Sequence, residues 1–353
     1  MVKRVLIHAK DLARIGPSQG DHLPALRVAL GVSVPLVLLL LLGRPDLSIY
    51  AVFGAFTGMY GRADRHRRRL RHQTKAALLL TAGLTVGVWL SVLQVQGWIL
   101  VAVEALFAVV GSFAADRARL KPSGPFYSIF ALGACASVPT TIPAWLATAI
   151  CAGSALFSIL VGSAGALRER AARLRSHANG QVRRPPAPVA RRNWPLAARS
   201  AAAVRVHAFR YLLAVGTAGT LGVLGGAGHA NWTMASAAVP LAAANRRGRI
   251  HRGIHRVVGT LLGVALTALL LLPGFDSTGL TVLLMLLLFP TELFMARHYG
   301  MAMMFFTPAI LLMSQLAHPI SRWVLVADRG METVLGAAVG MLVAVAVREP
   351  RAA

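Results

Sequence analysis

Long apolar stretches alternate with short polar ones along the whole 353-residue chain. A helix that crosses a bilayer needs about 20 largely apolar residues, or fewer where it is buried among other helices. The pattern predicts twelve such helices, at residues 25–42, 47–60, 76–93, 98–115, 125–139, 143–167, 206–225, 230–244, 255–272, 278–296, 299–316 and 323–347. The second and eighth segments are short enough to be re-entrant or interfacial. We therefore expect an all-α polytopic membrane protein with about twelve transmembrane helices.

One polar segment divides the twelve apolar stretches into two sets of six. Residues 168–203 are rich in arginine and proline and too polar to cross the bilayer. We predict a first membrane half at 1–167, a short basic cytosolic linker at 168–203 and a second membrane half at 204–353.

The two predicted halves show similar patterns. His22 and Arg27 open the first helix as His207 and Arg210 open the seventh, and each is followed by a short apolar helix, a basic loop and a long helix. An even number of helices in each half gives both halves one orientation, so we predict two parallel six-helix repeats.

A shorter pattern, RxxxTxxG, recurs within the second half at 256–263 and 329–336, three helices apart. An odd separation places the two copies in opposite directions. Each half is therefore predicted to be an inverted pair of three-helix units. The alternative is a chance recurrence in a chain rich in arginine and glycine.

Composition and charge support a membrane location. The chain is 56% hydrophobic and 14% charged, whereas soluble domains are about 25% charged. Its 37 Lys+Arg against 12 Asp+Glu would suit nucleic acid on a soluble surface, but here the basic residues fall between apolar stretches. Nearly all of them lie on one side if the amino terminus is cytosolic, as basic loops do. We predict that both termini are cytosolic and that the lipid bilayer, not nucleic acid, is the partner.

The sequence offers little for catalysis or metal binding. Cys135 and Cys151 are the only cysteines, both within apolar stretches and without CxxC spacing. A phosphate-binding GxxxxGK[ST] loop, an HExxH motif and a convincing Ser/His/Asp arrangement are all missing from the sequence. We expect neither an enzyme nor a bound cofactor or metal ion.

Three segments of the second half resemble the fusaric acid resistance proteins, or aromatic acid exporters. They are RVVGTLLG at 256–263, TELFMARHYGMAMMFFTPAILL at 291–312 and RGMETVLGAAVG at 329–340. The residues that match the family pattern are Arg256, Thr260, Gly263, Tyr299, Thr307, Pro308, Thr333 and Gly336. Glu332 stands where the family usually has Asp. The first half resembles the family only weakly.

The resemblance implies a transporter in the bacterial inner membrane that exports aromatic carboxylic acids. A more distant likeness to plant malate channels implies anion conduction. Larger relatives carry a sizeable cytosolic domain between the halves, which this chain lacks.

A few acidic and basic residues fall within the predicted helices, where a charge costs roughly 2.5–3.5 kcal/mol on insertion scales. These candidates for a substrate or proton pathway are Glu104, Glu292, Asp328, Arg329 and Glu332. Arg329 and Glu332 are three residues apart and can pair on one helix face. The functional hypothesis is an anion-binding Arg329 held by Glu332, with Glu292 coupling export to proton entry.

Each of these candidates also has a structural interpretation. The pairs could fix helix packing, Glu104 could be a protonated structural residue, and a later start of the last helix would leave Asp328 and Arg329 in an outer loop. Because most candidates lie in the second half, we expect that half to hold more of the pathway.

Two further features could bear on transport. Arg62, Arg71, Arg249 and Arg252 lie in basic loops that could concentrate anions at the cytosolic mouth, or contact lipid headgroups. The Thr307–Pro308 pair next to Met301, Met303, Met304, Phe305 and Phe306 could form an adaptable apolar wall for aromatic rings, or face lipid.

The sequence therefore predicts an inner-membrane transporter that exports organic, preferentially aromatic, carboxylate anions with proton coupling. The alternatives are an anion channel and a membrane scaffold without transport activity. A homo-oligomer is left open.

Overall fold

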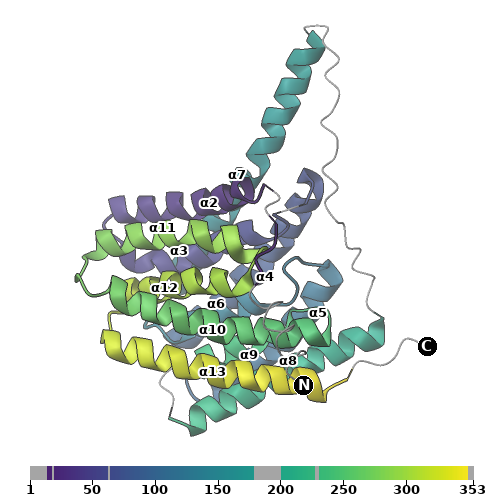
Figure 1. Cartoon of the computed structure of the whole chain (residues 1–353). Coiled ribbons are helices and arrows are strands. Elements are labelled where there is room, and N and C mark those ends of the chain that lie inside the picture. The colour runs from purple at the N-terminus through teal and green to yellow at the C-terminus, as the bar shows by residue number, and fades with distance from the viewer. Residues whose placement is uncertain (1–13, 18–19, 63, 179–199, 227–229, 349–353) are drawn as a thin grey trace.

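The computed structural model describes residues 14–17, 20–62, 64–178, 200–226 and 230–348, which form twelve α-helices and no strand (Figure 1). The helices are α2 (His22–Leu41), α3 (Ser48–Ala55), α4 (His66–Val92), α5 (Trp98–Ala118), α6 (Phe126–Ala136), α7 (Ala144–Ala178), α8 (Ala201–Leu224), α9 (Ala230–Leu241), α10 (Arg246–Leu270), α11 (Ser277–Met295), α12 (Tyr299–Ala317) and α13 (Arg322–Ala346). Short 3₁₀ turns flank α3. The expected all-α architecture is confirmed, and each predicted segment contains a helix.

Not all twelve helices are long enough to cross a membrane. Eight of the described helices are long and apolar enough: α2, α4, α5, α7 through Ala164, α10, α11, α12 and α13. Helices α3, α6 and α9 have 8, 11 and 12 residues, so each rises only about 12–18 Å. Helix α8 has 24 residues but carries His207 and Arg210 in its first half. The expected twelve helices therefore do not correspond to twelve full-length spans.

The short helices occupy the interior of the molecule. Every residue of α3 and α6 is buried, as are all residues of α9 after Ala230 and most of α12. Helices that end at membrane depth are tolerated when protein rather than lipid surrounds them. Each short helix is the middle member of a long–short–long set of three, and α12 holds the same place in the last set.

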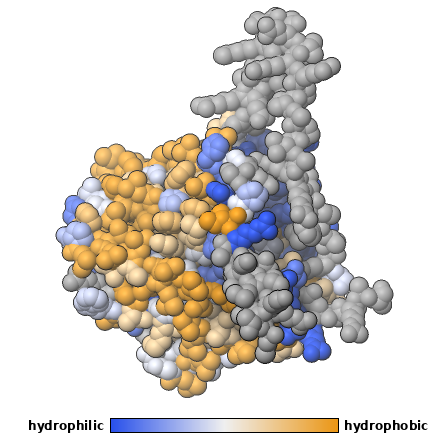
Figure 2. All heavy atoms as spheres, viewed as in Figure 1, coloured by the Kyte–Doolittle hydropathy of each residue, from blue (hydrophilic) through white to orange (hydrophobic). Residues whose placement is uncertain are grey.

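The longer helices form the outside. They expose large apolar side chains, among them Leu23 and Leu26 on α2, Leu106 on α5 and Leu286 on α11. Figure 2 shows a broad apolar surface along the sides of the helices, with hydrophilic residues gathered toward one end. Such a surface is what lipid tails would cover.

The helices pair in the same way in both halves. In the first half α4 packs on α6 and α7, and α7 packs on α3. In the second half α10 packs on α12 and α13, and α13 packs on α9. The halves meet through α5 with α8, α2 with α11, α6 with α9 and α3 with α12. These pairings suit the predicted repeats, but the two-repeat arrangement itself stays a prediction.

Glycines bring the interior helices α6, α9 and α12 close to their long partners. A Cβ atom added to any of six glycines would collide with a backbone carbonyl of the neighbouring helix; these are Gly83 and Gly87 of α4, Gly259 and Gly263 of α10, and Gly336 and Gly340 of α13. Small residues four positions apart are a common means of close helix contact in membranes. The glycines of the RxxxTxxG pattern therefore have a packing role.

Helix α7 extends into the residues predicted as linker, and the predicted bounds of the linker stay a prediction. Helix α7 continues to Ala178, past residue 167 where the first half was expected to end, because the arginine-rich sequence extends the helix beyond its apolar part. Residues 179–199 and both chain ends lie outside the described residues. The cytosolic location of the linker and termini stays a prediction.

Candidate functional site

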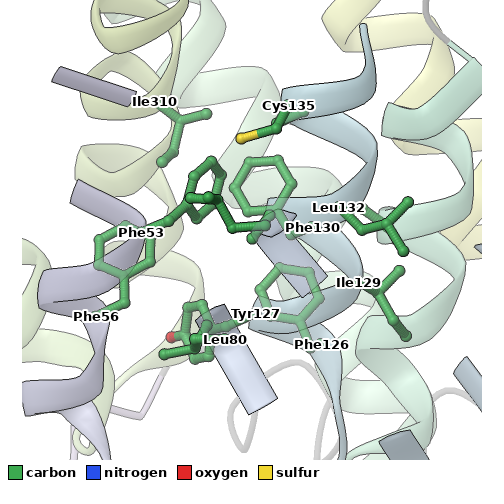
Figure 3. Close-up of a cluster of buried hydrophobic side chains, with 14 of the residues drawn as sticks. Phe53, Phe56, Leu80, Phe126, Tyr127, Ile129, Phe130, Leu132, Cys135 and Ile310 are labelled. Atoms are coloured by element: carbon green, nitrogen blue, oxygen red, sulfur yellow. The ribbon is translucent and has the colours of Figure 1, made fainter. Parts of the chain in front are cut away.

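Aromatic rings from α3 and the turn after it, α6, α9 and α12 meet in the interior. We call this set the central aromatic cluster: Phe53, Phe56, Tyr60, Phe126, Tyr127, Phe130, Trp232 and Phe306. Ring centroids are 5.3 Å apart for Phe53 and Phe130, and 5.3 Å for Phe130 and Trp232. Figure 3 shows the labelled rings of the first half gathered together. Such edge-on and tilted contacts typically contribute about 0.5–1.5 kcal/mol each.

Arg329 lies directly on this cluster. Its guanidinium carbon is 3.9 Å from the centre of the Trp232 ring, and the side chain is 1% exposed. None of its three side-chain nitrogens has a hydrogen-bond partner among the described residues. Because α13 begins at Arg322, Arg329 lies inside a helix. The alternative in which the last helix starts later is therefore wrong.

Arg256 approaches the cluster from α10. Its guanidinium carbon is 5.5 Å from the centre of the Phe126 ring, and Nη1 lies 3.0 Å from the sulfur of Met303. The residue is fully buried, and Nε and Nη2 have no hydrogen-bond partner among the described residues. Arg256 and Arg329 are electrostatic neighbours, with Glu332 also close to Arg329. Two buried cations against one carboxylate leave this region with excess positive charge.

The other residues of the family pattern lie around the two arginines. The hydroxyls of Thr260 and Thr307 are 3.5 Å apart across the α10–α12 contact, and Pro308 is buried beside them. Tyr299 opens α12, and its ring lies 4.4 Å from the guanidinium carbon of Arg252. Thr333 is buried on α13, one turn before Gly336.

The predicted apolar wall on α12 is only partly internal, because Met301, Met304 and Phe305 are partly exposed. Met303 and Phe306 are at most 1% exposed, and Phe306 contacts Phe56, Tyr127 and Phe130 of the first half. The buried part of the wall is thus one side of the central aromatic cluster.

Residues 213–343, which contain both arginines and Glu332, match the family model described as fusaric acid resistance protein-like. This region of the chain is similar to that family. The resemblance predicted from its motifs is confirmed for this family region. No curated protein and no solved structure matches the chain.

Glu292 of the family region pairs with the first half. Arg62 Nη1 donates to Glu292 Oε2 at 2.8 Å and to the Glu292 backbone carbonyl at 2.7 Å. The carboxylate is fully buried and the arginine side chain is 15% exposed. On the sequence alone, Arg62 is assigned to the cytosolic mouth and Glu292 to proton coupling. In the structure the two form an ion pair between the halves. Such a pair suits the structural interpretation, in which the charges fix helix packing.

Glu104 lies on α5 where the first half meets the family region. It is fully buried, and neither carboxylate oxygen has a hydrogen-bond partner among the described residues. A Cβ at Gly133 of α6 would lie 2.9 Å from Glu104 Oε2 and 2.8 Å from Asn231 Cβ. Asn231, at the start of α9, is equally buried, and both of its side-chain polar atoms lack partners in the described part of the chain.

The remaining predicted residues differ in burial and in their contacts. Asp328 is half-buried on α13 next to Arg329. Arg249 is buried and donates to the Ala243 carbonyl at 3.1 Å, and Arg252 stacks on Tyr299. Among the four arginines expected at the cytosolic mouth, only Arg71 is exposed.

The sequence did not single out Trp232, Asn231 or the aromatic residues of α3 and α6. The available signal was the shortness of their apolar segments, because a segment too short to span must be buried among longer helices. The sequence could not predict which rings contact one another, because the contacts join residues that are far apart in the chain.

Proposed function

We propose that this protein is a membrane transporter that exports organic anions, with aromatic carboxylates as the preferred class. The observation that carries the proposal is a pair of buried arginines, Arg256 and Arg329, beside a cluster of aromatic rings. No side-chain nitrogen of Arg329, and neither Nε nor Nη2 of Arg256, has a hydrogen-bond partner among the described residues. Glu332 is expected to hold Arg329 in place.

An aromatic carboxylate complements this arrangement. A guanidinium stacked over a ring uses its flat face and leaves its in-plane N–H groups for an acceptor. A carboxylate can accept two of those hydrogen bonds in parallel. A buried charge without such a partner costs several kcal/mol, and a bound carboxylate would offset that cost. The substrate ring would pack against the central aromatic cluster.

The packed interior favours a carrier over an open channel. Side chains of α3, α6, α9 and α12 fill the centre, so passage requires these helices to move apart. Short helices that end at mid-membrane near a binding site are typical of carriers with alternating access.

Export is the direction that charge and family suggest. The membrane potential, negative inside, drives an anion outward by about 2.3 kcal/mol per 100 mV. Fusaric acid is an aromatic carboxylic acid, and resistance fits its removal from a bacterial cell. We also propose that export is coupled to proton entry. Of the two buried carboxylates expected to take part, Glu292 is paired with Arg62 and Glu104 is not.

Counterflow in liposomes tests the proposal. Purified protein is reconstituted, and uptake of labelled terephthalate is measured against unlabelled terephthalate or adipate inside, with and without a pH gradient. We expect terephthalate to exchange and adipate to compete poorly. Arg329→Gln should abolish exchange, and Arg71→Gln, at an exposed position, should not.

Other outcomes identify the alternatives. Terephthalate currents that persist without a proton gradient and survive Glu292→Gln would indicate a channel. If no carboxylate moves under any condition, the transport proposal fails and a scaffold is favoured.

The proposed orientation places the basic ends of α4 and α10 and both termini in the cytosol of a bacterial inner membrane. Cys135 and Cys151 are buried, so a cysteine introduced at Arg71 or Asp46 can be labelled selectively in intact cells. A membrane-impermeant thiol reagent should label the cysteine at position 46 and not the one at 71. The reverse result would invert the orientation.

A further inference from the structure

The buried polar side chains of Glu104 and Asn231 both lie beside Gly133, and the proposed anion site does not use them. They come from opposite halves, α5 and α9, and both lie against Gly133 of α6. Four side-chain atoms, two carboxylate oxygens and the amide oxygen and nitrogen, lack hydrogen-bond partners among the described residues. Buried polar groups are nearly always partnered, so such a pair marks a place where something binds or changes state.

Among the described residues of the helices that pack along α5, none brings a second charge to the level of Glu104. On α8, which packs along α5, Gly216 lies by Ala105 and Gly219 by Val101. The titratable residues of α8 lie nearer its other end, where His207 pairs with Asp116 at 2.7 Å and Arg210 donates to the Val347 carbonyl.

The other neighbouring helices also bring no charge to this level. On α6, Gly133 faces the carboxylate, and the titratable Tyr127 and Cys135 lie in and above the aromatic cluster. The charged residues of α4 lie in its first three turns, at Lys75 and before. The stretch of α4 beside α6 at this depth is Gly83 to Gly87.

These features suit a proton as the ligand. A metal ion such as Na⁺ would need several more oxygens than one carboxylate and one amide supply. A protonated carboxyl carries no charge, and its O–H donor and C=O acceptor complement the acceptor and donor of the Asn231 amide. The step is simple: one proton joins one carboxylate, and the local charge changes from −1 to 0.

Helix α9 connects this pair to the anion site. Asn231 is followed by Trp232, whose ring lies under Arg329. Gly133 lies one turn after Phe130, whose ring contacts Trp232 at 5.3 Å. The residue beside Glu104 on α9, Asn231, is therefore the chain neighbour of the residue whose ring supports the guanidinium of Arg329.

We propose that Glu104 and Asn231 form a proton-binding site whose occupancy strengthens anion binding at Arg256 and Arg329. The sign follows from electrostatics. An ionised Glu104 adds a negative charge on the α9 side of the site, which opposes the binding of a substrate anion, whereas the protonated group carries no charge to repel it. The proposal rests on the proposed transport function and adds its regulation. Weak acids that enter a cell release protons there, so acidification would raise the loading of the carrier.

Equilibrium binding of labelled terephthalate to the purified protein tests the linkage. We expect the affinity of the wild type to fall from mildly acidic to mildly alkaline pH by about 5- to 150-fold, the usual range for coupled sites. Glu104→Gln mimics the protonated form, so it should keep the acidic-pH affinity at every pH. Glu292→Gln is the matched carboxylate control and should retain the slope. Asn231→Leu should move the midpoint and keep the affinity at the acidic end.

A second measurement covers the case in which Glu104→Gln does not fold. By reciprocity, terephthalate binding should make the wild type take up protons from a weakly buffered solution, up to one per chain. Arg329→Gln should bind no terephthalate and take up none. Binding without a pH slope or proton uptake, or a slope that persists in Glu104→Gln, overturns this inference alone. Absence of any terephthalate binding or movement instead overturns the proposed function.

Discussion

In the first half α4 packs on α6 through Gly83 and Gly87, and in the second half α10 packs on α12 through Gly259 and Gly263. Three residues before the first glycine of each pair, α4 has Leu80 and α10 has Arg256, and both side chains are fully buried. The two contacts thus share a backbone arrangement and differ in chemistry. Close helix packing recurs through the molecule, while buried positive charge occurs at only one of these two contacts.

The difference extends to the whole site. Most rings of the central aromatic cluster come from the first half, such as Phe53, Phe126 and Phe130, whereas the two arginines beside it, Arg256 and Arg329, come from the second. The proposed pathway therefore depends on both halves, one for apolar surface and the other for charge. We expected the second half to hold more of the pathway, and on this proposal that expectation concerns the charged residues and not the aromatic ones.

The shared backbone contact gives the largest expected effect. Gly87→Ala and Gly259→Ala each place a methyl group against a carbonyl of the partner helix, and backbone cannot move aside as a flexible side chain can. Each should lower the free energy of unfolding by more than the ~1–3 kcal/mol typical of overpacking, seen as a fall in Tm in detergent. Gly153→Ala, at a position with open space, is the control. A large effect in one half only would show that the two contacts are not equivalent.

The charge difference is tested by Arg256→Leu. Removing a buried cation with unfilled hydrogen bonds should leave stability unchanged or raise it. Terephthalate binding should weaken by about 2–5 kcal/mol, the usual cost of losing one partner of a buried charge pair. Binding by equilibrium dialysis and Tm are measured on the same preparation. Lost binding together with lost stability would favour a packing role for Arg256.

The reverse exchange, Leu80→Arg, puts the charge into the first half. No anion site is proposed there, so the buried cation should cost several kcal/mol and reduce the yield of folded protein. A stable Leu80→Arg protein that binds terephthalate at two sites would contradict the difference between the halves.

The sequence predicted the helices well because apolar length is a local property. Each predicted segment contains a helix, and the glycines of the RxxxTxxG pattern lie where helices touch. The shortness of α6 was not predicted, because residues 125–139 form one continuous apolar stretch. The helix itself begins after Pro125 and ends before Ser137. The spacing of apolar residues does not show whether a segment meets lipid or protein.

The site was only partly predictable for a different reason. Arg329, Glu332 and Arg256 stood out because charge in an apolar segment is rare. Trp232 did not, because an aromatic residue in an apolar helix is ordinary until its partner is known. Likewise the ion pair of Arg62 with Glu292 joins residues 230 positions apart, and no local pattern reports such a distance.

That ion pair gives a smaller expected effect. Glu292→Gln and Arg62→Gln are combined in a double-mutant cycle, with Tm or chemical unfolding as the readout. We expect a coupling energy of about 0.5–3 kcal/mol, as for other contacting charged residues. Terephthalate exchange at equal pH should persist in both single variants. A coupling energy near zero would show that the pair does not hold the halves together.

The smallest expected effect concerns the ring beneath Arg329. Trp232→Phe keeps an aromatic face but weakens its attraction for a cation, which is strongest for Trp and worth about 0.5–2 kcal/mol in total. Terephthalate affinity should therefore fall only about two- to fivefold, while Trp232→Leu, which removes the face, should cost more. Trp89→Phe, on the exposed surface of α4, should change nothing. If Trp232→Phe and Trp232→Leu weaken binding equally, the ring acts by filling space, and the second half would contribute charge to the site without the aromatic support that joins it to the first.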